Sequence, residues 1–106
     1  TLDALIAAHG RPDFVKIDVE GFEADVLAGL TQPLPALSFE FTTIQRDVAY
    51  ACLDRLMQIG AYRFDIALGE SQQLTFGRNV SKDEMTAHIR ALPHSANSGD
   101  VYAVLH

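Results

Sequence analysis

The chain has 106 residues, of which 48% are apolar and 21% are charged. This composition is typical of a folded globular domain and excludes disordered and fibrous proteins. No apolar run approaches the roughly 20 residues that a membrane-spanning helix needs. Fourteen Asp and Glu against eight Lys and Arg give a net charge of −6. This charge, without any basic stripe, argues against binding to nucleic acid or to an anionic membrane surface.

The cysteine content and the N-terminus bear on the compartment. The single cysteine, Cys52, cannot form a disulfide within the chain and excludes cysteine-rich zinc modules. It fits a reducing compartment, so we expect the cytoplasm. The N-terminus has neither the basic start nor the long apolar core of a signal peptide. It also lacks an initiator Met, so we expect a chain that is processed or cut from a longer one.

The first third of the chain predicts a helix, a strand and a second helix. Thr1 can cap the first helix, which Gly10 ends in a left-handed conformation. Residues 14–19 are rich in β-branched side chains and predict a strand. Residues 22–28 then predict a short helix that ends at Gly29.

The middle third predicts a strand, a helix and another strand. Residues 36–41 predict a strand after a connector that contains two prolines. A helix begins around residues 43–46, carries an apolar stripe at helical spacing, and ends at Gly60. Residues 62–68 alternate between two faces, which predicts a strand. The predicted inner face is Tyr62, Phe64, Ile66 and Leu68, and the other face is Ala61, Arg63, Asp65 and Ala67.

The last third predicts one helix and one strand. Residues 72–76 can form a short strand within an otherwise irregular segment. Ser81 and Glu84 fit a capping box, so a helix should run to about residue 92, before a polar loop. Residues 100–105 predict the last strand. The alternation of helices and strands predicts an α/β layered sheet with right-handed crossovers.

Charged side chains lie at the ends of the first two predicted strands, where open α/β sheets bind ligands. Lys16 and Asp18 share one face of the first strand, and Glu40 lies opposite the apolar face of the second. Strands inside parallel sheets are usually apolar on both faces, so a charge there needs a partner or a pocket. One interpretation is an ion pair between Lys16 and Glu40. The other is a polar pocket in which Asp18 and Glu40 face a substrate and Lys16 holds their charge.

Acidic residues also surround the start of the helix that follows the first strand. Glu23 and Asp25 are explained by favourable interaction with the helix dipole, worth about 0.3–1 kcal/mol each. Glu20 differs from them because it directly follows the strand end. Gly21 allows a tight turn or a close approach of backbone.

Three motifs in the first part of the chain resemble those of the FkbM family of methyltransferases. The family's pattern is T-x-D-x-L, then K-I-D-x-E-G-x-E, then V-L-x-G. The chain carries all three in order and at the right spacing, at residues 1–5, 16–23 and 26–29. Glu40, after an apolar strand, also matches the family's second acidic strand end. The resemblance is specific over residues 1–42 and topological beyond them.

The resemblance implies a class I, Rossmann-like fold that uses S-adenosylmethionine to methylate a hydroxyl group on a small-molecule acceptor, a sugar or a natural product. In that fold a glycine-rich loop after the first strand binds the cofactor, and this chain has no G-x-G loop. The four predicted strands therefore resemble the family's fourth to seventh strands, in the sheet order 4-5-7-6 with the last one antiparallel. Residues 1–106 are expected to form the C-terminal, acceptor-side half of a catalytic domain.

The resemblance also implies roles for individual residues. Asp18 and Glu20 would orient the acceptor hydroxyl or take its proton as general base. Glu40 would face the same cleft, and Lys16 would set the charge of these carboxylates. Asp18 and Gly21 would contact the cofactor. Methyl transfer is a direct displacement, so alignment of donor and acceptor supplies much of the catalysis.

Two other functions remain open at this point. A non-catalytic remnant or interaction module of the same fold would explain the missing glycine-rich loop. A Mg²⁺ or Ca²⁺ site formed by Asp18, Glu20 and Glu40 is less favoured, because Lys16 competes for the same carboxylates. The remaining reactive side chains have simpler explanations: Cys52 as core, Arg78 and Asn79 in a solvated loop, and His9, His88, His94 and His106 at the surface.

A sheet that starts at the strand containing Ile17 would leave that strand as an apolar, unpaired edge. Such edges invite pairing with another chain. We therefore expect the isolated chain to associate with itself through this strand.

Overall fold

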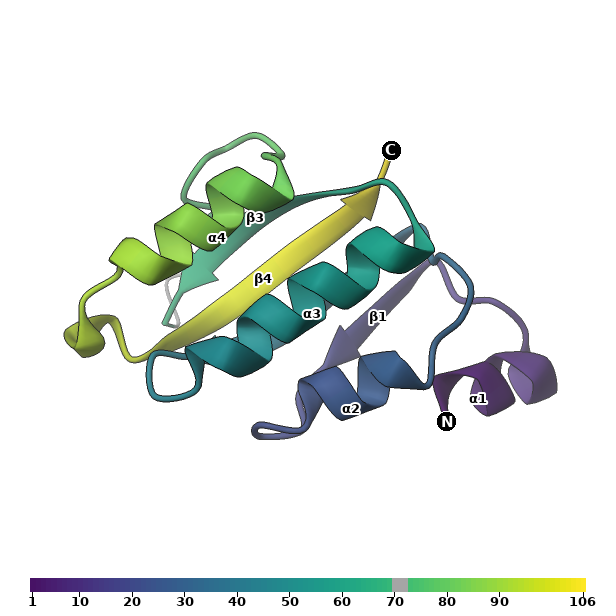
Figure 1. Ribbon diagram of the computed structural model, residues 1–106. Helices are drawn as coiled ribbons and strands as arrows, with labels where there is room; N and C mark the ends of the chain where they lie inside the picture. The colour runs from purple at the N-terminus through teal and green to yellow at the C-terminus, as the bar shows by residue number, and fades with distance from the viewer. Residues whose placement is uncertain (70–72) are drawn as a thin grey trace.

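The computed structural model of the chain describes residues 1–69 and 73–106. Within these residues, α-helices and strands alternate, and one short 3-10 helix precedes the last strand (Figure 1). The elements are α1 (Leu2–His9), β1 (Phe14–Ile17), α2 (Glu23–Ala28), β2 (Ala36–Thr42), α3 (Arg46–Ile59), β3 (Tyr62–Leu68), α4 (Lys82–Ala91), η1 (His94–Ala96) and β4 (Ser98–Leu105). The predicted alternation of helices and strands is confirmed. Part of the predicted short strand, Gln72, lies outside the described residues.

The strands form one four-stranded sheet in the order β1-β2-β4-β3. β1 pairs with β2 in parallel, whereas β4 runs antiparallel to both of its neighbours, β2 and β3. The last strand is therefore inserted between β2 and β3, and the sheet is mixed. β1 forms one end of the strand order and β3 forms the other. The predicted antiparallel pairing of the last two strands is confirmed.

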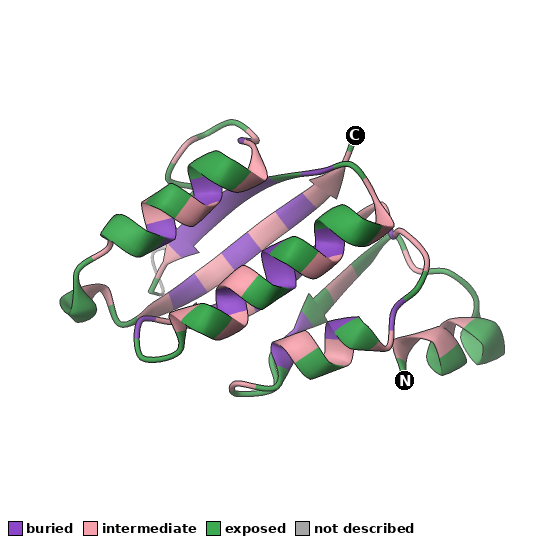
Figure 2. Ribbon diagram, viewed as in Figure 1, coloured by how far each residue is buried: buried purple, intermediate pink, exposed green. Residues whose placement is uncertain are grey.

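The helices α2, α3 and α4 lie side by side on one face of the sheet (Figure 1). The long helix α3 packs between the other two and against β2. Four residues of α3 at helical spacing are buried against the sheet: Ala49, Cys52, Leu53 and Leu56. The inner positions of the strands complete this core, and β4 shows the alternation plainly, with buried and less buried residues in turn (Figure 2). The prediction that Cys52 belongs to the core is confirmed.

Local sequence signals set the ends of several helices. The Thr1 hydroxyl accepts a hydrogen bond from the Ala4 amide at 3.1 Å, and the Ser81 hydroxyl accepts one from the Glu84 amide at 3.2 Å. Both serve as the predicted N-caps of their helices. Gly10 ends α1 with a φ of 91°, which favours glycine. α1 contributes no buried residue, and Asp3 ties it to the turn after α2 through the amide and hydroxyl of Thr31.

The opposite face of the sheet carries no α-helix in Figure 1, and we call it the helix-free face. Strand register places polar residues side by side on it, because Lys16 pairs with Ser38 and Ser38 with Tyr102. Asp65 extends this row on β3. Asp65 lies on the face opposite the predicted inner face of this strand, yet only 2% of the residue is exposed. The cause is residues 73–80, which run along β3 and donate the Phe76 amide to the Asp65 carboxylate at 3.0 Å.

One strand is shorter than predicted, and this shapes the functional site. β1 ends at Ile17 instead of Val19. The Val19 amide bonds to the Glu23 carboxylate instead of to β2, and Glu20 has a φ of 51°. The chain therefore leaves the sheet at Asp18 and forms a tight turn before α2. In the described part of the chain, no helix is both long and apolar enough to cross a membrane.

Candidate functional site

The candidate site lies where β1 and β2 end, because parallel strands present their carboxyl ends at the same edge of a sheet. Two segments converge there: the turn at residues 18–22, between β1 and α2, and residues 43–45, between β2 and α3. They meet closely at Gly21, where the Cβ atom of any larger residue would lie 2.6 Å from Oε1 of Gln45. Gly21 therefore allows the close approach that the sequence predicted, and its φ of 99° independently favours glycine.

The Glu23 carboxylate holds the turn at residues 18–22 in place. Its Oε1 accepts a hydrogen bond from the Gly21 amide at 2.9 Å, and its Oε2 accepts one from the Val19 amide at 3.1 Å. Only 2% of Glu23 is exposed. The predicted role, interaction with the helix dipole, does not account for this burial or for these two bonds. Asp25, for which the same role was predicted, is exposed in the first turn of α2.

Two acidic side chains from neighbouring strand ends share a contact in this site. The carboxyl group of Glu40, on β2, forms a side-chain hydrogen bond with that of Asp18, at the end of β1. Such a bond needs a proton between the two groups. This contact, partial burial, and the negative charges of Asp18, Asp100 and Glu23 together raise the pKa of Glu40 to about 7. Glu40 can therefore gain or lose a proton near neutral pH.

The first of the two interpretations, an ion pair between Lys16 and Glu40, is wrong. The ion pairs among residues 1–69 and 73–106 are Arg78–Glu84 and Lys82–Asp54, and Lys16 takes part in neither. The reason is strand register. Lys16 lies opposite Ser38, two positions before Glu40, so the backbone carries Asp18 rather than Lys16 to the level of Glu40.

A cavity of about 350 Å³ opens between the two converging segments. Its acidic side is formed by Glu20, Glu23 and Glu40. Its other residues are Gly21, Phe41, Thr42, Ile44, Gln45 and Val48. The structure thus brings acidic residues from the turn after β1, from α2 and from β2 to one cavity, whose lining also includes apolar residues of β2 and α3. A volume of this size suits a small molecule.

A second, smaller depression of about 220 Å³ lies beside the first. It is lined by Lys16, Glu40, Gly69, Ser98, Gly99 and Asp100. Glu40 borders both hollows, so a proton on its carboxyl group is accessible from either. Lys16 lines this second depression together with Glu40, which places its charge near the site without a direct ion pair.

Several other candidates from the sequence do not join this site. In the part of the chain that the structure describes, no three His, Cys, Asp or Glu side chains are grouped so as to hold a metal ion, and this includes Asp18, Glu20 and Glu40. Burial raises the pKa of the Cys52 thiol to about 12, so it stays protonated and unreactive at neutral pH.

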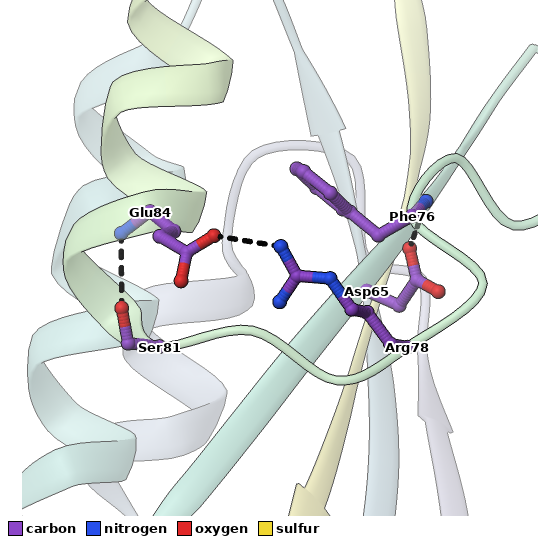
Figure 3. Close-up of polar contacts among 5 residues, drawn as sticks. All are labelled: Asp65, Phe76, Arg78, Ser81 and Glu84. Carbon is purple, nitrogen blue, oxygen red and sulfur yellow. Dashed lines mark hydrogen bonds and ion pairs between the residues drawn. The ribbon is translucent and has the colours of Figure 1, made fainter.

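Arg78, which Figure 3 shows with its neighbours, is not among the residues that line the cavity. Arg78 Nη2 forms an ion pair with Glu84 Oε2 at 3.3 Å, and 63% and 51% of the two side chains are exposed. Nearby, Asp65 points toward the Phe76 amide and accepts its hydrogen bond (Figure 3). These contacts fix residues 73–80 against β3 and the start of α4, which is a structural role.

Glu23 and Gln45, which both contact the turn at residues 18–22, were not assigned to the site from the sequence. Glu23 was placed at the helix dipole, and Gln45 was not singled out. For Glu23 a signal was present, because it is the last acidic position of the K-I-D-x-E-G-x-E motif. For Gln45 there was none, since its contact with Gly21 joins segments 24 positions apart.

Comparison with known proteins agrees with the resemblance drawn from the motifs. A family model described as the methyltransferase FkbM domain matches residues 1–98, which is most of the chain. No curated protein matches the chain significantly. The chain therefore belongs to the FkbM methyltransferase domain family.

Proposed function

We propose that this FkbM-family chain forms the acceptor side of an S-adenosylmethionine-dependent methyltransferase site that methylates a hydroxyl group of a sugar or natural product. The family membership supports the reaction class. The acceptor-side assignment rests on the contact of Asp18 with Glu40, a residue that lines the cavity. A group with a pKa of about 7 is suited to take a proton at neutral pH.

In this proposal Glu40 is the general base. The acceptor hydroxyl lies in the cavity of about 350 Å³ and donates a hydrogen bond to the Glu40 carboxylate. As the oxygen bonds to the incoming methyl carbon, its proton passes to Glu40. Asp18, beside it, shares that proton and returns it to water. Glu20, at the exposed rim of the same cavity, orients a further polar group of the acceptor.

The family implies S-adenosylmethionine as the cofactor, and the residues of this chain can meet part of what it needs. S-adenosylmethionine supplies a methyl group on a positively charged sulfur, and the sulfur leaves with the bonding electron pair. The net negative charge of the Asp18 and Glu40 pair, which shares one proton, suits such a cation. The space beside Gly21 is taken by the Gln45 side chain, so Gly21 shapes the turn. Asp18 is accordingly the residue of this chain that we propose to face the methyl donor.

We further infer that the four strands correspond to the family's fourth to seventh strands. The order β1-β2-β4-β3, with β4 antiparallel, supports this correspondence. The sequence also contains no G-x-G loop. The main contacts to the cofactor would then come from a glycine-rich half outside these residues.

The first experiment separates this proposal from a self-contained cofactor site. Isothermal titration of S-adenosylmethionine into the 106-residue chain should show no saturable binding. Saturable binding with a stoichiometry near one would contradict the half-site proposal.

The second experiment tests the base. In an enzyme that joins this chain to a glycine-rich half, methyl transfer to hydroxyl acceptors is followed by mass spectrometry. Glu40→Gln should lower kcat by about 10²–10⁴-fold, the usual contribution of a general base. The control Asp25→Asn removes an equal charge from an exposed position outside the cavity and should leave kcat unchanged. Full activity of Glu40→Gln would overturn the assignment.

A further inference from the structure

We propose that Glu23 is the positioning residue of this site: its carboxylate fixes the turn that holds Asp18 against Glu40. The importance of this role for catalysis rests on the proposed function, but the role itself concerns the geometry of this chain. Glu23 lines the cavity, but in this role it acts by fixing the backbone that carries Asp18 and not by binding the acceptor.

The first argument is the burial of the Glu23 carboxylate. A buried charge is costly unless it is paired or hydrogen-bonded. Glu23 is 2% exposed, and it is absent from the ion pairs of the described residues. Its compensation comes from backbone, because each oxygen accepts one amide, from Val19 at 3.1 Å and from Gly21 at 2.9 Å. Hydrogen bonds from amides to a carboxylate are stronger than bonds between neutral groups.

The second argument is the shape of the turn that these bonds hold. Glu20 has a φ of 51° and Gly21 has a φ of 99°, so two successive residues adopt a left-handed backbone. Such conformations cost free energy and persist only where the surroundings enforce them. The amides on either side of Glu20 are the two that Glu23 binds. Glu23 therefore clamps this turn at both of its ends.

The third argument is the position of Asp18 between two fixed points. Ile17 is held by β2, where it pairs with Phe39, and Val19 is held by Glu23. One residue between two anchored neighbours has little freedom, so its carboxyl group stays next to Glu40. Without the bond to Val19, the turn could relax and Asp18 could swing into solvent, since Asp18 is itself exposed.

The charged groups around Glu40 determine its pKa, and this pKa can be used to measure how Glu23 positions Asp18. Asp18 follows β1, Glu23 begins α2 and Asp100 lies on β4, and all three raise the pKa of Glu40. Lys16 and Glu20 line the two hollows that Glu40 borders. Glu23 thus reaches Glu40 in two ways: directly through its charge, and indirectly by placing Asp18. The experiment has to separate these two effects.

Glu23→Asp separates them, because it keeps the negative charge but shortens the side chain by one methylene. The titration of Glu40 is followed by carbon-13 NMR of its side-chain carboxyl in the folded 106-residue chain. The proposal expects the Glu40 pKa to fall in Glu23→Asp, by most of the decrease that Asp18→Asn produces. A direct charge effect alone predicts no decrease, and that result would overturn the proposal.

A thermodynamic cycle supplies the second measurement. Glu23→Gln in the Asp18→Asn background should change the Glu40 pKa far less than in the wild-type background, because the partner that Glu23 positions is already removed. Equal changes in both backgrounds would overturn the proposal. Asp25→Asn, on the same helix, removes a charge without touching the turn and should leave the Glu40 titration in place.

Amide hydrogen exchange tests the clamp even where a variant is less stable. In Glu23→Gln the Val19 and Gly21 amides should exchange about tenfold faster or more, relative to core amides of the same sample, as expected for the loss of a charged hydrogen bond. Unchanged relative exchange would count against the clamp.

Whether the positioning by Glu23 matters for catalysis is tested separately, in the complete enzyme. Glu23→Asp should lower kcat about tenfold to a hundredfold with KM within about twofold, because a positioning error affects the transition state most. If Glu23→Asp abolishes the raised pKa of Glu40 but leaves kcat unchanged, the positioning role of Glu23 stands. In that case Glu40 is not the general base. Unchanged titration together with unchanged kcat would overturn the positioning role itself.

Discussion

Tyr62 has a hydroxyl group that makes two hydrogen bonds to a single residue of the connector before β2. It donates to the Leu34 carbonyl at 2.6 Å and accepts from the Leu34 amide at 2.7 Å, and both residues are buried. In Tyr62→Phe the buried amide and carbonyl of Leu34 lose their partner. We expect a loss of about 1–3 kcal/mol in the free energy of unfolding, measured by urea denaturation. Tyr102→Phe, at a half-buried position, is the control and should cost less.

The pKa of Glu40 also predicts a pH dependence of stability. Its pKa is about 7 in the folded chain, against a reference value of 4.5. The folded state therefore holds a proton that the unfolded state has lost between these two values. This contribution to stability is complete below about pH 4.5 and is lost as the pH rises through about 7.

Thermal melting from about pH 4.5 to about pH 8 measures this contribution, because this range spans the two pKa values. Glu40→Gln carries a permanently uncharged group, so its melting temperature should fall less over this range than that of the wild type. A wild type and a Glu40→Gln variant with parallel pH profiles would contradict the raised pKa.

At the residue scale, the sequence indicated that carboxylates gather at the strand ends, but it did not indicate which side chain lies next to Glu40. Asp18, Glu20 and Glu40 were expected at one cleft, and the structure brings them to neighbouring strand ends. An ion pair between Lys16 and Glu40 was one of the two interpretations that the sequence left open. The parallel register decides that point, because Lys16 lies opposite Ser38, and Asp18, two positions further along the chain, reaches the level of Glu40.

At the scale of elements, the turn between β1 and α2 depends on its glycine for two separate reasons. Gly21 has a φ of 99°, and a side-chain carbon there would meet the Gln45 amide oxygen. Gly10 has a φ of 91° but has open space around it. Gly10→Ala therefore measures the backbone strain alone, about 1–3 kcal/mol.

Gly21→Ala should lower the free energy of unfolding by more than Gly10→Ala, because it adds a steric clash between the segments before α2 and α3. Adding Gln45→Ala to Gly21→Ala should recover only that excess. Equal costs for the two glycine variants in urea denaturation would show that the contact with Gln45 contributes nothing.

The elements themselves were largely predictable. Strong periodicity located α3 and β3, and cap residues located the starts of α1 and α4. β1 was predicted two residues too long, because Asp18 and Val19 have strand-like neighbours in sequence. Val19 leaves the sheet for the buried carboxylate of Glu23, a bond that periodicity does not encode.

At the scale of the whole molecule, β1 leaves one side of the sheet without a partner strand in the described chain. Its first residue, Phe14, is 49% exposed, and Val19 and Phe22 beyond its end are also exposed. Free apolar edges promote pairing with another chain. We therefore expect the isolated chain to self-associate through β1, as a concentration-dependent dimer in sedimentation velocity.

Phe14→Lys should weaken this association, because a charged residue on an edge strand opposes pairing. Met57→Lys is the matched control, since Met57 is 42% exposed but lies on α3. A wild type that stays monomeric at high concentration, or equal effects of the two variants, would contradict association through β1.

The sequence by itself determined the class of this protein: an α/β chain with FkbM motifs and with carboxylates at two strand ends. These features are local, because they depend on periodicity, on caps and on motifs of contiguous residues. The tertiary structure decided what those carboxylates do to one another. The register between β1 and β2 places Asp18, not Lys16, beside Glu40, and the buried Glu23 holds the turn that keeps it there. Both follow from contacts between separate segments, and such contacts alone set the burial and the neighbours that shift a pKa.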